Sequence, residues 1–158
     1  MKLLQSSKES LVFHLGKREK DILLAVLKRY PCIPSAHQPL SKSGKLPHPE
    51  ANQRLLDEAL AENRAGNKRQ LRTFLADPRR LAENETGFRL SLSPSDLEWL
   101  LQILNDIRVG SWIILGSPEE KAEASLLNEK TAPHFWAMEM SGLFQMHLLE
   151  AMEGGRET

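Results

Sequence analysis

The sequence has little of several features that define whole classes of proteins. It holds one cysteine, Cys32, among 158 residues, so no disulfide can form within the chain and nothing indicates an oxidising compartment. No uninterrupted apolar run approaches the roughly 20 residues of a membrane-spanning helix. The first ten residues, MKLLQSSKES, lack the apolar core of a secretory signal. We therefore expect a cytoplasmic protein without a membrane segment.

The chain also lacks the short motifs of common catalytic, nucleotide and metal sites. It contains no P-loop, no glycine-rich dinucleotide fingerprint, no HExxH and no CxxC pair. His147 and Glu150 have a spacing that occurs in metal-binding bundles, but no second pair repeats it. Cys32 and His37 are close in sequence, but no surrounding residues indicate an activated thiol. The sequence therefore predicts a non-enzymatic protein with no cofactor and no metal.

The charge balance is zero overall but uneven along the chain. Residues 1–80 carry sixteen Lys and Arg against eight Asp and Glu, whereas residues 81–158 carry five against thirteen. Such asymmetry is found in proteins that contact nucleic acid or a charged partner. It is also what two halves of one domain show when they fold against each other, and we favour this interpretation.

Residues 88–104, FRLSLSPSDLEWLLQIL, pass from one apolar period to another. Residues 88–92 alternate apolar and polar as in a half-buried strand, and the apolar residues that follow recur at helical spacing. Ser93 has the position of a helix N-cap, followed by Pro94 at the first helical position and Asp96 at the third. The SPSD stretch is therefore predicted to be a strand-to-helix junction and not a catalytic site.

An earlier stretch, residues 11–27, repeats this design. It reads LVFHLGKREKDILLAVL, with Gly16 at the cap position and Glu19 as the acidic third residue. Because an isolated strand leaves its backbone groups without partners, we expect the strands near 11–15 and 88–92 to pair with each other. The pattern does not distinguish parallel from antiparallel pairing.

The remaining segments are predicted to form loops and helices. Five of the nine prolines lie in 31–49, which predicts a long surface loop. Helical periodicity then extends over 50–77, where Gly66 separates two amphipathic stretches. A Ser-Pro-x-Glu start at 117–120 predicts a short helix that runs towards Lys130.

The final helix, expected over 133–152, is apolar around nearly its whole circumference, which is typical of a buried helix. Its methionines and aromatic residues also suit a partner surface. One side could pack in the core while the other forms a homodimer seam, because a small domain rarely surrounds a helix completely. The residues that we expect to bind a partner are Trp136, Met140, Phe144 and His147.

A basic segment is the alternative binding surface, for nucleic acid. A solvated helix face explains it more simply, since no aromatic residues are interleaved for base stacking. The residues concerned are Arg64, Lys68, Arg69, Arg72, Arg79 and Arg80. A smaller polar cluster, Asn105, Asp106 and Arg108, borders the apolar face of the following helix, and we expect surface salt bridges there.

Two segments, LNDIRVGSWIILGSPEE (104–120) and AMEMSGLFQMHLLEAM (137–152), together resemble the C-terminal part of a bacterial family of unknown function. In that family a leucine-rich helix carries an LND[IL]R segment, and the last helix has an aromatic residue, a glycine and paired leucines. Residues 47–77 are similar to the family's charged helix pair. The resemblance implies a mostly helical cytoplasmic protein, often encoded near the adaptor of the Clp protease, and it brings no catalytic residues.

The predicted fold is mainly α, an irregular bundle of five or six helices with a minor two-stranded β element and the last helix at its centre. We expect a single helical domain over residues 1–153, with strand–helix units at 11–29 and 88–115 and a disordered tail at 154–158. The predicted function is that of an interaction or regulatory protein whose partner is another protein or a second copy. Nucleic-acid binding through residues 64–80 is the alternative.

Overall fold

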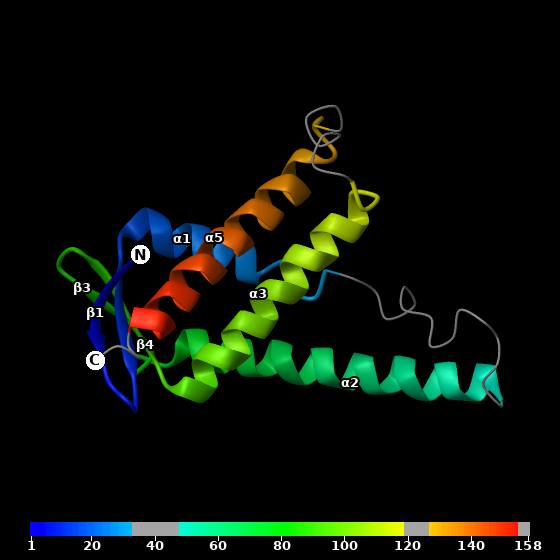
Figure 1. Cartoon of the computed structure of the whole chain (residues 1–158), viewed down its shortest axis with the longest axis horizontal. Coiled ribbons are helices and arrows are strands. Elements are labelled where there is room, and N and C mark those ends of the chain that lie inside the picture. The colour runs from blue at the N-terminus through cyan, green and yellow to red at the C-terminus, as the bar shows by residue number, and fades with distance from the viewer. Residues whose placement is uncertain (33–47, 119–126, 155–158) are drawn as a thin grey trace.

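The computed structural model describes residues 1–32, 48–118 and 127–154, and within them the chain combines a four-stranded sheet with four helices. The strands are β1 (Lys2–Ser6), β2 (Leu11–Leu15), β3 (Leu81–Asn84) and β4 (Gly87–Leu92). The helices are α1 (Lys17–Leu27), α2 (Pro49–Ala76), α3 (Pro94–Ile114) and α5 (Ala132–Gly154). Figure 1 shows the sheet at one end of the molecule, with α1, α3 and α5 leading away from it and α2 along one side.

The two strands expected from the sequence do pair with each other, and the pairing is antiparallel. Leu11 lies opposite Leu92, Phe13 opposite Leu90, and Leu15 opposite Phe88. These residues belong to the main apolar core or pack against it. The alternation seen in the sequence therefore correctly identifies the face of the sheet that the helices cover.

The prediction of a two-stranded element in a bundle of five or six helices is wrong. The sheet has four strands in the order β1-β2-β4-β3, and all neighbouring pairs are antiparallel. The two missed strands, β1 and β3, form the edges, and neither contains a buried residue. An edge strand of this kind is held by backbone hydrogen bonds to its neighbour, so its side chains need not alternate.

The junction between β4 and α3 has the predicted capping geometry. The Ser93 hydroxyl accepts a hydrogen bond from the Asp96 backbone N–H at 3.1 Å, and the Asp96 carboxylate accepts one from the Ser93 backbone N–H at 3.1 Å. Pro94 follows the cap as the first residue of α3. Each polar group of the SPSD stretch that contacts the backbone thus satisfies a free N–H at the helix start.

Helix α2 is one continuous helix, whereas the sequence predicted an interruption at Gly66. Glycine inside a helix costs only about 1 kcal/mol relative to alanine, which neighbouring turns can compensate. The 28 residues of α2 correspond to roughly 42 Å at the rise of an α-helix. Its N-terminal half extends beyond the other helices (Figure 1), and among its residues of described burial only Leu71 and Phe74, near the C-terminal end, are buried.

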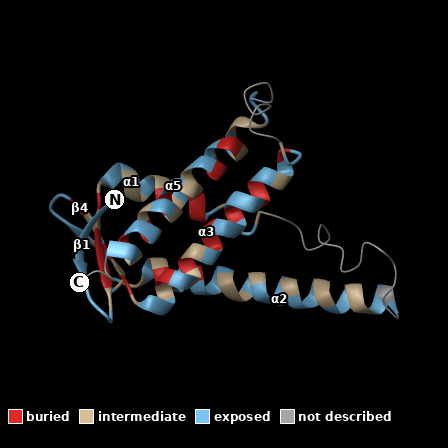
Figure 2. Cartoon of the chain, in the orientation of Figure 1, coloured by how far each residue is buried: buried red, intermediate tan, exposed pale blue. Residues whose placement is uncertain are grey.

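The core lies where α1, α3 and α5 meet the sheet (Figure 2). Helices α3 and α5 run antiparallel: Leu101 accepts a hydrogen bond from Gln145 near the sheet, and Leu115 clusters with Phe135 at the far end. The predicted final helix is confirmed, but it is not enclosed at the centre. One side of α5 packs on α3 and α1, and the other side is exposed.

Three predictions concern segments outside the described residues. Most of the predicted loop 31–49 falls in 33–47, and most of the helix expected after Ser117 falls in 119–126. The expected tail falls almost wholly in 155–158.

Candidate functional site

A hollow of about 890 Å³ lies along the exposed side of the α3–α5 pair, and we call it the α3/α5 groove. It extends over the C-terminal half of α3 and the N-terminal half of α5. Its lining residues are Asn105, Arg108, Val109, Trp112, Pro118, Met138, Glu139, Gly142, Leu143 and Met146. A concave surface with both apolar and charged residues is typical of a binding site.

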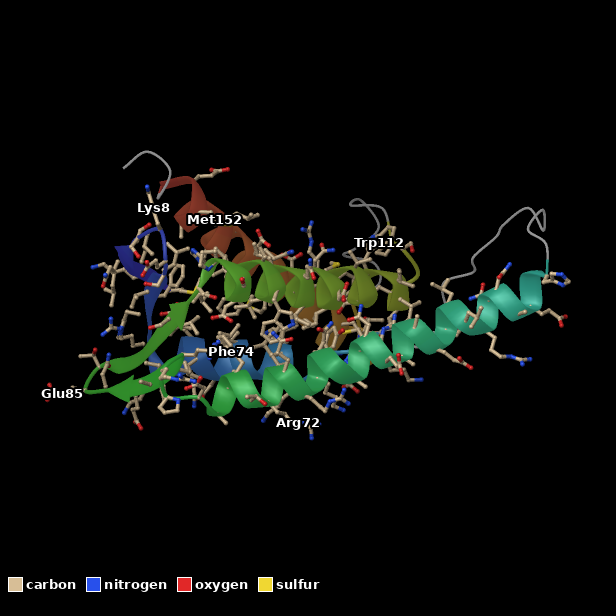
Figure 3. The ribbon with its side chains drawn as sticks, turned by 90° about the horizontal axis from the view of Figure 1, so that it is seen from below. Lys8, Arg72, Phe74, Glu85, Trp112 and Met152 are labelled. Atoms are coloured by element: carbon tan, nitrogen blue, oxygen red, sulfur yellow. The ribbon has the colours of Figure 1, made fainter. Side chains whose placement is uncertain are left out.

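Exposed apolar side chains line both helices of the groove. Val109 and Trp112 on α3, and Leu143 and Met146 on α5, are each at least 40% exposed. The two members of each pair are three residues apart, which places them on the same face of their helix. The Trp112 indole N–H donates to the carbonyl of Pro118 at 3.1 Å, and Figure 3 shows Trp112 at the end of α3 that is distant from the sheet. A row of this kind on a helix pair is found at protein interfaces.

Two charged residues of opposite sign, Arg108 on α3 and Glu139 on α5, also line the groove. A side chain at Gly142 would come to 3.9 Å from Cδ and Nε of Arg108, so the arginine lies across the surface of α5 where the glycine leaves room. Within the described part of the chain, neither Arg108 nor Glu139 forms an ion pair. Both charges are therefore available to a partner.

The four residues predicted to bind a partner do not share one surface. Trp136 is 37% exposed and His147 is half-buried, whereas Phe144 is buried in the core and Met140 packs against it. The outward row of α5 instead includes Leu143, Met146 and Leu149. The sequence of a helix that is apolar all round does not indicate which side faces the core. The predicted set therefore combines core-facing and outward-facing residues.

The basic residues proposed for nucleic acid fall into three groups. Lys68, Arg69 and Arg72 are exposed on α2, and Figure 3 shows Arg72 directed away from the other helices. Arg64 lines a separate hollow between α2 and α3.

The third group, Arg79 and Arg80, is already paired. Arg79 Nε lies 3.2 Å from an Asp77 carboxylate oxygen. Arg80 contacts Asp77 at 2.6 Å and Asp96 at 3.2 Å. Only three of the six cations thus form an exposed and unpaired group on one helix.

The Arg80–Asp96 contact connects β3 and the turn before it to the cap of α3, and it predicts an acid-sensitive contribution to stability. Burial raises the pKa of Asp96, but hydrogen bonds from Ser93 and Arg80 outweigh it, so the pKa lies below its ordinary value. Hydrogen bonds from Arg79 and Arg80 likewise lower the pKa of Asp77 to about 2. Such stability is complete above the pKa of the unfolded carboxyl, about 3.9, and is lost as the pH falls through the lower pKa of the folded state.

We expect Asp96→Asn to lower the free energy of unfolding by about 1 kcal/mol at neutral pH, because a hydrogen bond to a charged group is weakened. The difference from the wild type should shrink as the pH falls below about 4. Urea unfolding at several pH values measures both effects. Asp21→Asn is the control, since Asp21 is exposed and its ion pair within the described residues is a 3.5 Å contact to the adjacent Lys20. If the difference in the free energy of unfolding between Asp96→Asn and the wild type stays the same at low pH, the ionised carboxylate of Asp96 does not provide this stability.

The other predicted pairs are placed as follows. His37, the proposed partner of Cys32, lies outside the described residues. Burial raises the pKa of the Cys32 thiol, which is the reverse of activation. Asp106 and Arg108 form no ion pair with described residues, so the expected salt bridges are not present there.

Two features are absent from the described residues. No helix among them is long and apolar enough to cross a membrane. Nowhere in these segments do three or more His, Cys, Asp or Glu side chains gather in a way that could hold a metal ion. Comparison with known proteins found no match to a family model, a curated protein or a solved structure.

Proposed function

We propose that the protein is a non-enzymatic interaction protein whose α3/α5 groove pairs with the same groove of a second copy. The observation that carries the proposal is the exposure of Val109, Trp112, Leu143 and Met146 along one surface. Aromatic residues, methionine and arginine are enriched in protein interfaces, and the groove contains all three kinds.

The charges of the groove favour a second copy over an unlike partner. In a two-fold symmetric dimer the same patch faces itself, so every contact occurs twice. A patch that holds one cation and one anion can then place Arg108 of each copy against Glu139 of the other. A partner of a single charge sign would be attracted by one of these residues and repelled by the other.

A nucleic-acid function has less support. Of the six proposed cations, Lys68, Arg69 and Arg72 are exposed on α2 without an ion pair to described residues, whereas Arg79 and Arg80 are paired with carboxylates. The affinity of a protein for a nucleic acid rises with the number of phosphates that its cations neutralise. A group of three on one helix therefore provides a small electrostatic contribution.

Leu143→Glu should dissociate the dimer. A carboxylate in the middle of a dry interface has no partner, so the dissociation constant should rise at least about 100-fold, which is ~3 kcal/mol. Sedimentation equilibrium at micromolar concentrations measures the change. The matched control is Leu55→Glu, because Leu55 is 63% exposed on α2 and lies outside the groove.

Charge reversal tests the pairing that we assign. Arg108→Glu and Glu139→Arg should each weaken the dimer, and the double variant should recover most of the loss, because the reversed pair attracts again. A wild-type protein that is monomeric at these concentrations would refute self-association. Equal dissociation by the Leu143 and Leu55 variants would refute the role of the groove.

A further inference from the structure

A second hollow lies between α2 and α3, and it shares only Asn105 and Val109 with the lining of the α3/α5 groove. It has a volume of about 340 Å³ and is bounded at one end by the residues that follow α1, from Tyr30 to Cys32. This volume is within the range of about 300–1,000 Å³ that small-molecule sites occupy. We call it the α2/α3 cleft.

One end of the cleft is held in place by a hydrogen-bonded cluster. The side-chain amide of Asn67 donates to the Tyr30 hydroxyl at 3.1 Å, and its oxygen accepts from the Trp99 indole N–H at 3.2 Å. Trp99 also packs against Phe74, with ring centroids 5.7 Å apart, and Figure 3 shows Phe74 on the side of α2 that faces α3. These contacts fix the position of α2 against α3, so the cleft has a defined width.

Two residues of opposite charge line the cleft from different helices. Arg64 belongs to α2 and Asp106 to α3, and the two form no ion pair in the described structure. Loss of water around it raises the pKa of Asp106, and the positive charge of Arg64 only partly opposes this. The carboxylate therefore lacks a cation in direct contact, and a bound ammonium group would stabilise its ionised form.

The rest of the lining supplies an apolar wall and neutral polar groups. Leu60, Pro31 and Val109 are apolar, and Gln102 and Asn105 offer amide donors and acceptors without charge. A lone anion near Arg64 would also meet the negative charge of Asp106, and a lone cation near Asp106 would meet Arg64. A molecule that carries both charges satisfies both residues at once.

We propose that the α2/α3 cleft binds a free α-amino acid, with its carboxylate at Arg64, its ammonium group at Asp106 and an apolar side chain against Leu60 and Val109. The proposed role is binding alone, because burial raises the pKa of the Cys32 thiol in the cleft and so does not activate it as a nucleophile. It goes beyond the proposed self-association: the cleft and the groove share Asn105 and Val109 at their common border, whereas Arg64 and Asp106 line the cleft alone.

Isothermal titration of the full chain with three probes tests the proposal. The first is L-leucine, the second 4-methylpentanoate, which lacks the ammonium group, and the third 3-methylbutylamine, which lacks the carboxylate. We expect leucine to bind and each single-charge analogue to bind at least about ten-fold more weakly, because each loses one hydrogen-bonded charge pair.

Two variants assign the charges to their residues. In Arg64→Gln, leucine should lose its advantage over 3-methylbutylamine, and in Asp106→Asn it should lose its advantage over 4-methylpentanoate. Arg72→Gln is the matched control, since Arg72 is exposed on the same helix outside the cleft. For each variant, the affinities of the three probes are compared with one another on the same folded protein. A change in the overall stability of the variant therefore does not affect the comparison.

The proposal is overturned if leucine shows no binding at millimolar concentration. It is also overturned if leucine binds no better than its two analogues, or if the Arg64 and Asp106 variants keep the wild-type discrimination. If Arg72→Gln weakens leucine binding as strongly as Arg64→Gln does, the ligand binds elsewhere on the protein. This result would also refute the site.

Discussion

Replacing Gly87 with alanine should lower the free energy of unfolding by about 4 kcal/mol. Gly87 begins β4 with φ of +155°, and a Cβ there would lie 2.3 Å from the carbonyl oxygen of Leu15 and 3.2 Å from Cα of Gly16. Both obstacles are backbone atoms, which cannot move without disturbing β2. Strain at such a position and forced repacking each cost about 1 to 3 kcal/mol.

Urea unfolding followed by circular dichroism measures this loss. The control is Gly66→Ala in α2, where a new Cβ would meet only the end of the Arg69 side chain at 3.8 Å. Alanine is a better helix former, so this variant should be more stable than the wild type by about 0.5 to 1 kcal/mol. If both substitutions have effects of the same sign, the close approach of β4 to β2 at this position is incorrect.

Asn67→Ala is the second substitution for which we expect a large effect, a loss of about 2 kcal/mol. It removes the partners of the Tyr30 hydroxyl and of the Trp99 indole N–H. Tyr30 is buried, and a buried polar group left without a partner costs about 1 to 3 kcal/mol. Because Leu71 and Phe74 are the only buried residues among those of α2 whose burial is described, hydrogen exchange along this helix should accelerate more than in α3.

The single tyrosine of the chain provides a spectroscopic test of the same bond. Burial raises the pKa of Tyr30, and the hydrogen bond from Asn67 lowers it and so opposes part of this rise. The Asn67→Ala variant should therefore titrate at higher pH in an ultraviolet absorbance measurement. Thr73→Ala, at an exposed position of α2 where the hydroxyl bonds only within its own helix to the Arg69 carbonyl, should leave the titration unchanged. A lower pKa in Asn67→Ala would show that the tyrosine gains exposure to water.

The predicted fold class was wrong, but two local features of it were predicted correctly. Alternation over residues 88–92 and the Ser93–Asp96 pair describe local geometry that neighbouring residues determine, and both are present in the structure. The edge strands β1 and β3 were missed because backbone pairing, which leaves no side-chain pattern, holds them in place. The continuity of α2 through Gly66 was missed because a glycine weakens a helix without ending it.

The candidate sites were less predictable than the fold. Val109 and Leu143 are ordinary apolar residues in sequence, and they become a surface only because α3 and α5 pack through their other sides. Arg64 and Asp106 lie on separate helices, and no local spacing relates them. Arg64 was assigned to a basic surface and Asp106 to surface salt bridges, whereas the tertiary structure places both in one cleft.

The pairing of β2 with β4 joins residues that are far apart in the sequence. β1–β2 and β3–β4 are local hairpins, but residue 11 must find residue 92 before the central ladder exists. Contacts this distant in sequence slow folding, because the chain loses the entropy of closing a long loop before the contact contributes any stabilising energy. Closure entropy grows slowly, by about 0.6 kcal/mol for each doubling of the loop. Lengthening the chain between the hairpins should therefore slow refolding while leaving the native state nearly as stable.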